Sequence, residues 1–309
     1  MTFQRFTTFL GFFSGLRKEA PAPWSIQTKL PVERISADSL GLEQSMVAGA
    51  IRPVIFKTDQ ELGYAAAEEI FAGIEKAERD GERFVLGCPG GRSPRSTYQA
   101  LGGLISSNQQ PLGHLYLAMM DEYASKTPHG SFQNVEEVSH FSCRRFGFEE
   151  IRDLLNTGLS TELHLPHSQV LVPNAAHPEE FEKLLDELGI DIFLLASGAT
   201  DGHVAFNGRG TDRNSGVRVA SLSDETRKDN LHTFPEFNSL SEVPLFGVTV
   251  GPRTIAALSK KAIMLLQGSH KRLAFDRITS AQNYEADWPA TIITECQNPS
   301  IFADAAASE

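Results

Sequence analysis

The stretch FVLGCPGGRSPRSTY, residues 84–98, contains the clearest signal for the fold. Its apolar beginning predicts a buried strand that runs directly into Gly90 and Gly91. A helix is then expected to begin, with Ser93 as its N-cap and Pro94 in its first turn. Glycines let a backbone approach an anion closely, and the free amides at a helix start point toward it. The segment fits a phosphate-binding loop and an ordinary strand-to-helix turn equally well.

Strand and helix signals alternate on both sides of this stretch. Thr58-Asp59-Gln60-Glu61 has the pattern of a capping box, in which the Thr hydroxyl and the Glu carboxylate each satisfy an amide at a helix start. Helix-like stretches such as 178–187 and 269–278 separate most of the apolar runs. The expected strands are 54–56, 84–88, 115–120, 169–172, 190–195, 246–250, 262–267 and 290–295. This order predicts an α/β fold: a three-layer sandwich with a mostly parallel central sheet and helices on both faces.

The same signals divide the chain into an arm and a body. Residues 1–53 are predicted to form an N-terminal arm, and residues 54–309 a single α/β domain. Within the arm, an apolar stripe between Phe3 and Leu16 has near-helical spacing. Polar residues interrupt this stripe, which favours a packing helix or a homo-oligomer contact over a membrane or targeting segment.

Composition limits the partners and the compartment. The formal net charge of -11 does not suit a nucleic-acid-binding protein, whose footprint is basic. No run is long and apolar enough to span a bilayer, so no membrane partner is expected. The three cysteines lack the paired spacing of zinc or redox motifs, which predicts reduced thiols in the cytoplasm. An anionic substrate would need local donors, because the net charge opposes it.

Two acids follow the predicted strand 115–120. Asp121 and Glu122 therefore stand at a strand end, where the active sites of α/β proteins occur. A carboxylate there could move a proton between carbons. Taken alone, these acids are better explained as a helix cap or as solvated side chains.

Two further segments carry polar side chains after predicted strands. Asp201 and His203 lie two residues apart beside Gly202, so the carboxylate could orient the imidazole for acid–base work. A structural Asp-Gly turn with a satisfied histidine explains them equally well. Lys271 begins the predicted helix 269–278, where a positive charge opposes the helix dipole unless an anion is bound.

Together these segments resemble the glucosamine-6-phosphate deaminase family, which is related to 6-phosphogluconolactonase and ribose-5-phosphate isomerase. The resemblance covers roughly residues 54–305. It rests on the order and spacing of Gly90-Gly91-Arg92-Ser93-Pro94, Met120-Asp121-Glu122-Tyr123, Asp201-Gly202-His203-Val204-Ala205-Phe206-Asn207, Val248-Thr249-Val250-Gly251 and Gly268-Ser269-His270-Lys271.

The resemblance implies an aldose–ketose isomerisation of an amino-sugar phosphate, coupled to loss of ammonia, with no metal or other cofactor. Asp121 would shuttle a proton between the first two carbons, His203 would help to open the sugar ring, and Asp201 would support His203. The residues expected to hold the phosphate are Gly90, Gly91, Arg92, Ser93 and Lys271. Further possible substrate contacts are Glu122, Asn207, Arg209 and His232.

The chain departs from the family pattern around this expected pocket. Gly208 stands where family members carry a glutamate that completes the relay to the histidine. Ser197-Gly198-Ala199 replaces a glycine-x-glycine run, and His232 aligns with a phosphate-binding arginine. The loop 124–140 also differs. These changes indicate an altered substrate or weakened chemistry.

Three functions remain open from the sequence. The leading interpretation is an amino-sugar phosphate deaminase/isomerase. A lactonase-type hydrolase is compatible with Gly208, because that sister family lacks the glutamate, although lactonases carry Asp-Glu-Arg where this chain has Asp121-Glu122-Tyr123. A non-catalytic sugar-phosphate sensor would keep Lys271 and the glycine loop without the relay.

Overall fold

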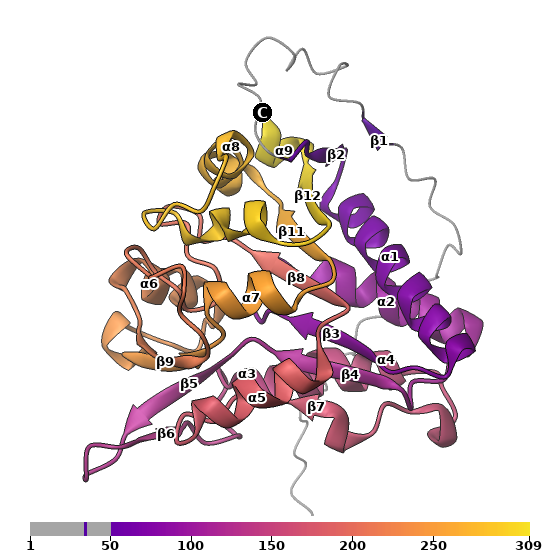
Figure 1. Cartoon of the computed structure of the whole chain (residues 1–309), viewed down its shortest axis with the longest axis horizontal. Helices are drawn as coiled ribbons and strands as arrows, with labels where there is room; N and C mark the ends of the chain where they lie inside the picture. The colour runs from indigo at the N-terminus through magenta and orange to yellow at the C-terminus, as the bar shows by residue number, and fades with distance from the viewer. Residues whose placement is uncertain (1–33, 36–50) are drawn as a thin grey trace, which may run out of the picture.

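A long parallel sheet runs through the computed structural model, which describes residues 34–35 and 51–309 (Figure 1). The order of its strands is β1 (Arg34–Ile35), β2 (Val54–Phe56), β12 (Pro299–Asp304), β11 (Ala262–Leu266), β8 (Ile192–Ala196), β3 (Phe84–Cys88), β4 (Leu115–Met119) and β7 (Val170–Leu171). Strands β2 to β7 in this order all run parallel, and β1 pairs antiparallel with β2. The predicted mostly parallel sheet is therefore confirmed.

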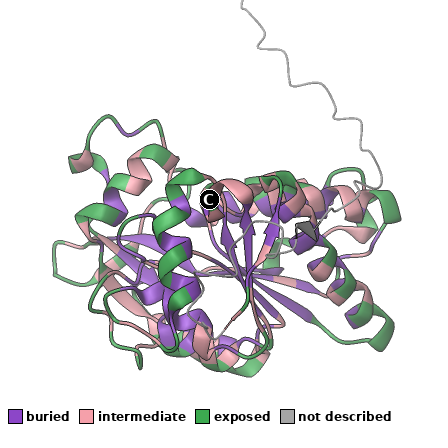
Figure 2. Ribbon diagram, turned by 90° about the horizontal axis from the view of Figure 1, so that it is seen from above, coloured by how far each residue is buried: buried purple, intermediate pink, exposed green. Residues whose placement is uncertain are grey.

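Helices cover both faces of this sheet. On one face lie α1 (Asp59–Asp80), α2 (Arg95–Asn108), α3 (Cys143–Phe146) and α4 (Asp153–Asn156), whose apolar residues share a core with β3 and β4. On the other face lie α5 (Pro178–Leu188), α7 (Pro252–Leu258) and α8 (Arg272–Ser280). Figure 2 shows the buried sheet between helices with exposed outer sides. This arrangement is the predicted three-layer sandwich.

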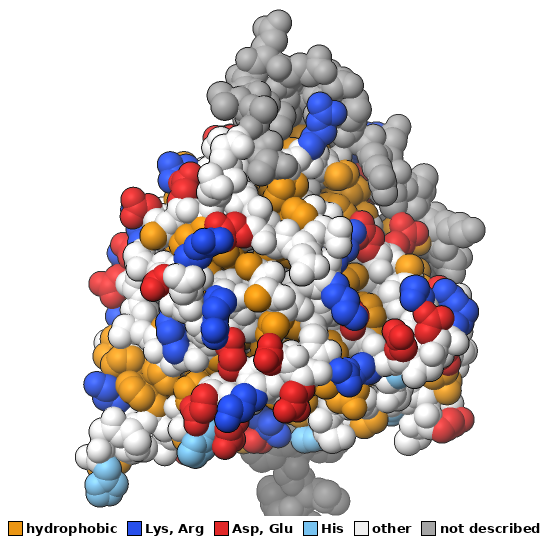
Figure 3. Space-filling model, viewed as in Figure 1, with side chains coloured by type: hydrophobic (Ala, Val, Ile, Leu, Met, Phe, Trp, Pro, Cys, Tyr) orange, Lys and Arg blue, Asp and Glu red, His pale blue; other side chains and the backbone are white. Residues whose placement is uncertain are grey.

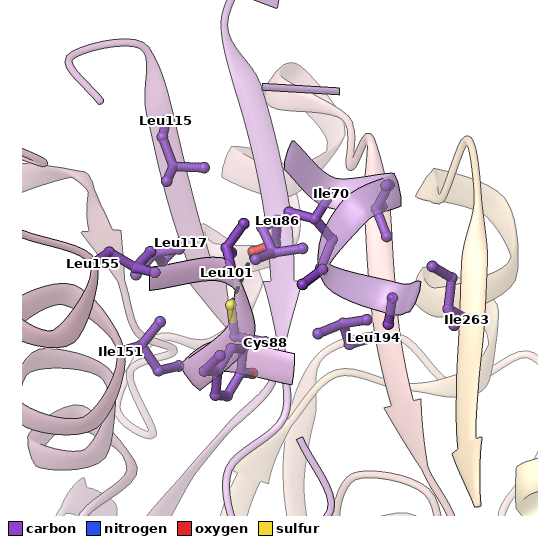
Figure 4. Close-up of a cluster of buried hydrophobic side chains, with 14 of the residues drawn as sticks. Ile70, Leu86, Cys88, Leu101, Leu115, Leu117, Ile151, Leu155, Leu194 and Ile263 are labelled. Atoms are coloured by element: carbon purple, nitrogen blue, oxygen red, sulfur yellow. Dashed lines mark hydrogen bonds between the residues drawn. The ribbon is translucent and has the colours of Figure 1, made fainter. Parts of the chain in front are cut away.

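The packing of the first layer follows from the sequence pattern. The buried face of α1 includes Ile70, and that of α2 includes Leu101. Both side chains meet Leu86 of β3 and Leu117 of β4 in one apolar cluster (Figure 4). The start of α1 follows the predicted capping box, because the Thr58 hydroxyl accepts a hydrogen bond from the Glu61 amide at 3.1 Å.

A second, antiparallel sheet was not predicted. Its strands, in order, are β6 (Phe132–Asn134), β5 (Asp121–Lys126), β10 (Phe246–Thr249) and β9 (Arg218–Ser221). The chain passes from β4 directly into β5 at Met120. The amide of Met120 donates to the Cys88 carbonyl at 3.1 Å, and its carbonyl accepts from the Val250 amide at 2.9 Å. Met120 thus joins the two sheets, and Asp121 is the first residue beyond the junction.

Two local predictions were wrong. Residues 290–295 belong to a 3-10 helix, Pro289–Glu295, and not to a strand. Short buried apolar runs do not distinguish strand from helix, and proline suits a first helical turn. Ser93 is not a cap, since α2 begins at Arg95 with no side-chain capping bond.

The remaining expectations concern the N-terminal stripe, membrane spans, cysteines and surface charge. The apolar stripe from Phe3 to Leu16 lies outside the described residues. No helix in the described part is long and apolar enough to cross a membrane. Cys88, Cys143 and Cys296 are buried and unpaired. Basic and acidic side chains are interspersed on the face seen in Figure 3, so no field of one sign dominates it.

Candidate active site

Loops at the carboxyl ends of four adjacent strands form one cavity. β11, β8, β3 and β4 are neighbours in the larger sheet, so the loops that follow them meet at one edge. The cavity has a volume of about 190 Å³. Its lining includes residues 90–93, Asp121, Ser197, His203 and Lys271. The four segments singled out in the sequence therefore converge.

The loop after β3 lines this cavity and has free backbone amides. Within the described part of the chain, the N–H groups of residues 90–93 donate to no acceptor. The Tyr98 hydroxyl donates to the Pro89 carbonyl at 2.9 Å and so supports the base of the loop. Gly91 has a φ of 86°, a conformation that residues with a Cβ avoid. A run of unpaired amides is suited to bind the oxygens of an anion.

Lys271 supplies a positive charge beside this loop. The side chain is buried, and its Nζ donates to the Ser197 carbonyl at 2.5 Å. Burial lowers the pKa of Lys271, and the nearby charge of Arg92 lowers it further, while Asp229 and Asp201 oppose the shift. Lys271 lies after Gly268, whose amide is held by both carboxylate oxygens of Asp304 at 2.9 Å.

Asp121 reaches the cavity from the junction between the two sheets. Its Oδ1 accepts hydrogen bonds from the Thr249 hydroxyl at 2.5 Å and from the Phe206 amide at 3.2 Å. Burial raises the pKa of Asp121 to about 7, although these two donors and the charge of His203 act in the opposite direction. Near neutral pH this carboxyl can therefore both accept and return a proton.

Asp201 holds the imidazole of His203. Oδ1 of Asp201 lies 2.8 Å from Nδ1 of His203 and 3.2 Å from the His203 amide. Burial alone would raise the pKa of Asp201, but the hydrogen bonds and charge of His203 lower it to about 2. At neutral pH Asp201 is ionised and must accept the Nδ1 hydrogen, which leaves Nε2 of His203 available. Gly198 permits this contact, because a Cβ there would lie 2.1 Å from Oδ1.

The other oxygen of Asp201 contacts the first turn of α6 (Asp224–Thr233). The Ser223 hydroxyl lies 3.4 Å from Oδ2, and the Thr226 hydroxyl 3.3 Å. Ser223 is also the N-cap of α6, since it accepts a hydrogen bond from the Thr226 amide at 3.1 Å. The pair of Asp201 and His203 is thus hydrogen-bonded to the start of α6, the helix that closes one side of the cavity.

The expected further contacts do not line the cavity. Glu122 instead accepts hydrogen bonds from the amides of Tyr123, Cys143 and Arg144 and from the Ser142 hydroxyl, at 2.8 to 2.9 Å. Burial raises the pKa of Glu122, and these donors oppose the shift. Glu122 therefore fixes the start of α3 to β5.

Asn207, Arg209 and His232 also lie elsewhere. The Asn207 amide donates to the carbonyls of Val204 and Val250 at 2.9 and 2.8 Å, which holds the loop after β8. Arg209 donates to the Thr200 carbonyl at 2.9 Å and lines a separate hollow. His232 is exposed on α6.

Sequence reasoning assigned no role to several residues of the cavity wall. Those on α6 are Asp229, Asn230 and Thr233, and those after β11 are Gln267 and His270. A signal was present for α6, because Ser223 and the acids after it have the pattern of a helix start. Among the described residues, no group of three His, Cys, Asp or Glu side chains could hold a metal ion.

The arrangement combines an anion-binding end with a proton-transfer end. Free amides and Lys271 can hold a phosphate, while Asp121 and His203 face the same cavity and can exchange protons with a ligand. Groups of this kind can act on a phosphorylated ligand that carries an acidic C–H or a hydroxyl.

Comparisons with known proteins identify the family of the chain. Residues 57–302 match the family described as glucosamine-6-phosphate isomerases/6-phosphogluconolactonase. A glucosamine-6-phosphate deaminase from Shouchella clausii is 29% identical over 259 residues, which cover 82% of this chain and 94% of that protein. A glucosamine-6-phosphate isomerase from Candida albicans is 28% identical over 268 residues, covering 84% and 98%.

Solved structures share the fold. A monomeric glucosamine-6-phosphate deaminase superimposes with a TM-score of 0.70 at 25% identity, covering 84% of this chain and 99% of that one. The 6-phosphogluconolactonase from Leishmania guyanensis superimposes with a TM-score of 0.58 at 18% identity, covering 85% and 98%.

Proposed function

Because the chain belongs to the family of glucosamine-6-phosphate isomerases and 6-phosphogluconolactonases, we propose that it is an amino-sugar phosphate deaminase/isomerase. The proposed reaction converts glucosamine-6-phosphate, or a close analogue, to fructose-6-phosphate and ammonia. This choice is supported by a deaminase among the similar sequences and by another among the similar solved structures.

The position and pKa of Asp121 are the observation that carries the proposal. Its carboxyl lines the cavity together with His203, and burial raises its pKa to about 7. A base that takes a proton from C2 of a sugar and returns it to C1 must hold and release that proton at similar cost. A carboxyl with an ordinary pKa would hold it poorly.

The remaining residues take roles along the substrate. The amides of residues 90–93 and the ammonium of Lys271 bind the phosphate. Nε2 of His203 exchanges a proton with the ring oxygen as the pyranose opens, and Asp201 keeps the imidazole in that tautomer. Asp121 then moves a proton from C2 to C1 while a proton passes from the amino nitrogen to the C1 oxygen, which leaves an imine at C2 and a hydroxyl at C1. Water adds to this imine, and the C–N bond breaks to give the ketone and ammonia.

We also propose that the relay is altered. Gly208 supplies no carboxylate, and a Cβ at this position would lie 3.8 Å from Cβ of Ser223. The hydroxyls of Ser223 and Thr226 therefore take over the support of Asp201. His232 is exposed on α6 and leaves Lys271 and the loop amides as the phosphate ligands.

Release of ammonium and fructose-6-phosphate from glucosamine-6-phosphate tests this function, with Asp121→Asn as the control. Production by the native chain that is lost in the variant supports the proposal. Absence of production by the native chain overturns it. A lactonase-type hydrolase, which is compatible with Gly208, would then be tested by whether 6-phosphogluconolactone opens faster than it does spontaneously.

A further inference from the structure

Two amide atoms in the cavity wall are buried without a hydrogen-bond partner. They are Nδ2 of Asn230 and Oε1 of Gln267, and the absence of partners refers to the residues that the structure describes. A buried polar atom that pairs with nothing is destabilising, so such atoms in a binding cavity indicate a missing ligand.

Both residues flank the phosphate-binding end of the cavity. Asn230 lies on α6 one turn before Thr233, whose methyl group is 3.8 Å from the position of a Cβ on Gly91. The side of α6 that carries Asn230 therefore faces the glycine loop. Gln267 lies between the end of β11 and Gly268, four positions before Lys271.

The hydrogen-bonding chemistry of the two atoms indicates whether they bind the phosphate or a hydroxyl of the ligand. Asn230 offers a donor, and Gln267 offers an acceptor. In the orientation that the structure gives the two amides, the oxygens of a phosphate dianion, which only accept hydrogen bonds, cannot pair with Oε1 of Gln267. A sugar hydroxyl accepts from one amide and donates to the other. In the proposed function the phosphate is bound by the amides of residues 90–93 and by Lys271.

We propose that Asn230 and Gln267 are specificity-determining residues that bind sugar hydroxyl groups near the phosphate-bearing carbon. The inference rests on the proposed function for the identity of the ligand as a sugar phosphate. It adds that the site rejects phosphorylated ligands without these hydroxyls, because binding them would leave both amides unpaired.

A ligand series tests the proposal by calorimetry. The probes are inorganic phosphate, propyl phosphate and racemic glycerol 1-phosphate, which differ in the carbon chain and in its hydroxyls. The native chain should bind glycerol 1-phosphate at least about 10-fold more tightly than propyl phosphate, since each of the two amides gains a hydrogen-bond partner. In Asn230→Ala and in Gln267→Ala this ratio should fall at least about 3-fold, because each variant removes one of the two contributions, with the affinity for inorganic phosphate unchanged.

Controls keep the outcomes separate. Asn238→Ala removes an exposed amide that bonds to Glu242 outside the cavity, and it should keep the native ratio. Two variants on different elements guard against the misfolding of one. An unchanged ratio in both variants overturns the proposal, as does an equal loss of affinity for all three probes, which would assign the amides to the phosphate. Because no turnover is measured, a chain that fails to release ammonia can still pass this test.

Discussion

The hydroxyl of Thr249 donates to Oδ1 of Asp121 at 2.5 Å, although 128 residues separate them in the chain. The contact exists because β10 pairs antiparallel with β5, with Thr249 opposite Asp121 in the register. The antiparallel sheet thus places a donor on the carboxyl that faces the cavity.

Thr249→Val should shift the pH profile of activity upward. A hydrogen bond to the ionised carboxylate lowers its pKa, so its loss should raise the pKa of Asp121 above about 7. The acidic limb of the kcat/KM profile should move up by about one pH unit, with activity at pH 7 reduced and partly restored at higher pH. Thr254→Val removes a buried hydroxyl that bonds to Glu182, and should leave the profile in place.

Asp121→Asn should stabilise the fold above neutral pH. Below about pH 4 the native carboxyl is protonated in both the folded and unfolded chains, so the variant should have little effect. As the pH rises toward about 7, the unfolded chain releases this proton while the folded chain retains it, which destabilises the native protein. The variant should therefore unfold at higher temperature at pH 8, with a gain of up to about 4 kcal/mol.

A control variant shows whether the gain in stability comes from relieving a buried carboxylate or only from removing a negative charge. Asp186 is exposed on α5, so Asp186→Asn removes the same charge without the desolvation. An equal gain in both variants, or a gain for Asp121→Asn that is as large at pH 4 as at pH 8, would contradict the assigned cause.

The sequence predicted the edge of the sheet at which the cavity lies. Gly90, Asp121, Ser197 and Lys271 follow apolar runs, and parallel strands bring such positions to one edge. That inference needs only the strand order along the chain. From the strand order alone, the sequence predicted that the glycine loop, the carboxyl of Asp121 and the Asp201–His203 pair lie at this edge.

The partners of these side chains could not be predicted in the same way. Thr249 meets Asp121 only through the register of the antiparallel sheet, and β5 has the polar sequence DEYASK, which does not resemble a buried strand. Glu122 was expected near the substrate, but its carboxylate caps α3, which a local pattern does not reveal. The hydrogen-bond partners of Asp121 and Glu122 are both set by contacts between residues that lie far apart in the chain.

Lys271→Met should weaken the binding of phosphate ligands while the fold persists. The change removes the charge but keeps the aliphatic chain, so affinity for inorganic phosphate should fall about 10- to 100-fold. Because burial lowers the pKa of Lys271, native affinity should decline at a lower alkaline pH than an exposed lysine would allow. The variant should lack this decline. Lys228→Met, an exposed change on α6, should bind phosphate normally, and an unchanged affinity in Lys271→Met would refute its assigned role.

Thr226→Val should impair the relay through Asp201. Loss of a donor to Oδ2 should raise the pKa of Asp201 from about 2, and kcat should fall about 10-fold with KM little changed. The low native pKa stabilises the fold above about pH 4, and this contribution is lost as the pH falls toward 2. Acid unfolding of the variant should therefore begin at a higher pH.

Ser223→Ala removes both a donor to Asp201 and the N-cap of α6, so it needs its own control. Thr58→Ala removes the N-cap of α1, far along the chain from the relay, at a cost of about 1 kcal/mol. If Ser223→Ala and Thr58→Ala lower stability alike and neither changes kcat, the hydroxyl of Ser223 has no part in the relay.

Gly198→Ala should separate the catalytic end of the cavity from its phosphate-binding end. The added Cβ would lie 2.1 Å from Oδ1 of Asp201 and 2.3 Å from Nδ1 of His203, so the two side chains must move apart. Turnover should fall by at least about 100-fold, because an imidazole without its carboxylate partner loses its orientation. Binding of inorganic phosphate should remain, because residues 90–93 and Lys271 are not displaced. Gly103→Ala adds the same methyl group on α2, where nothing lies within 4 Å, and should be neutral or slightly stabilising. Near-native turnover in Gly198→Ala would mean that the contact between Asp201 and His203 is not needed for the reaction.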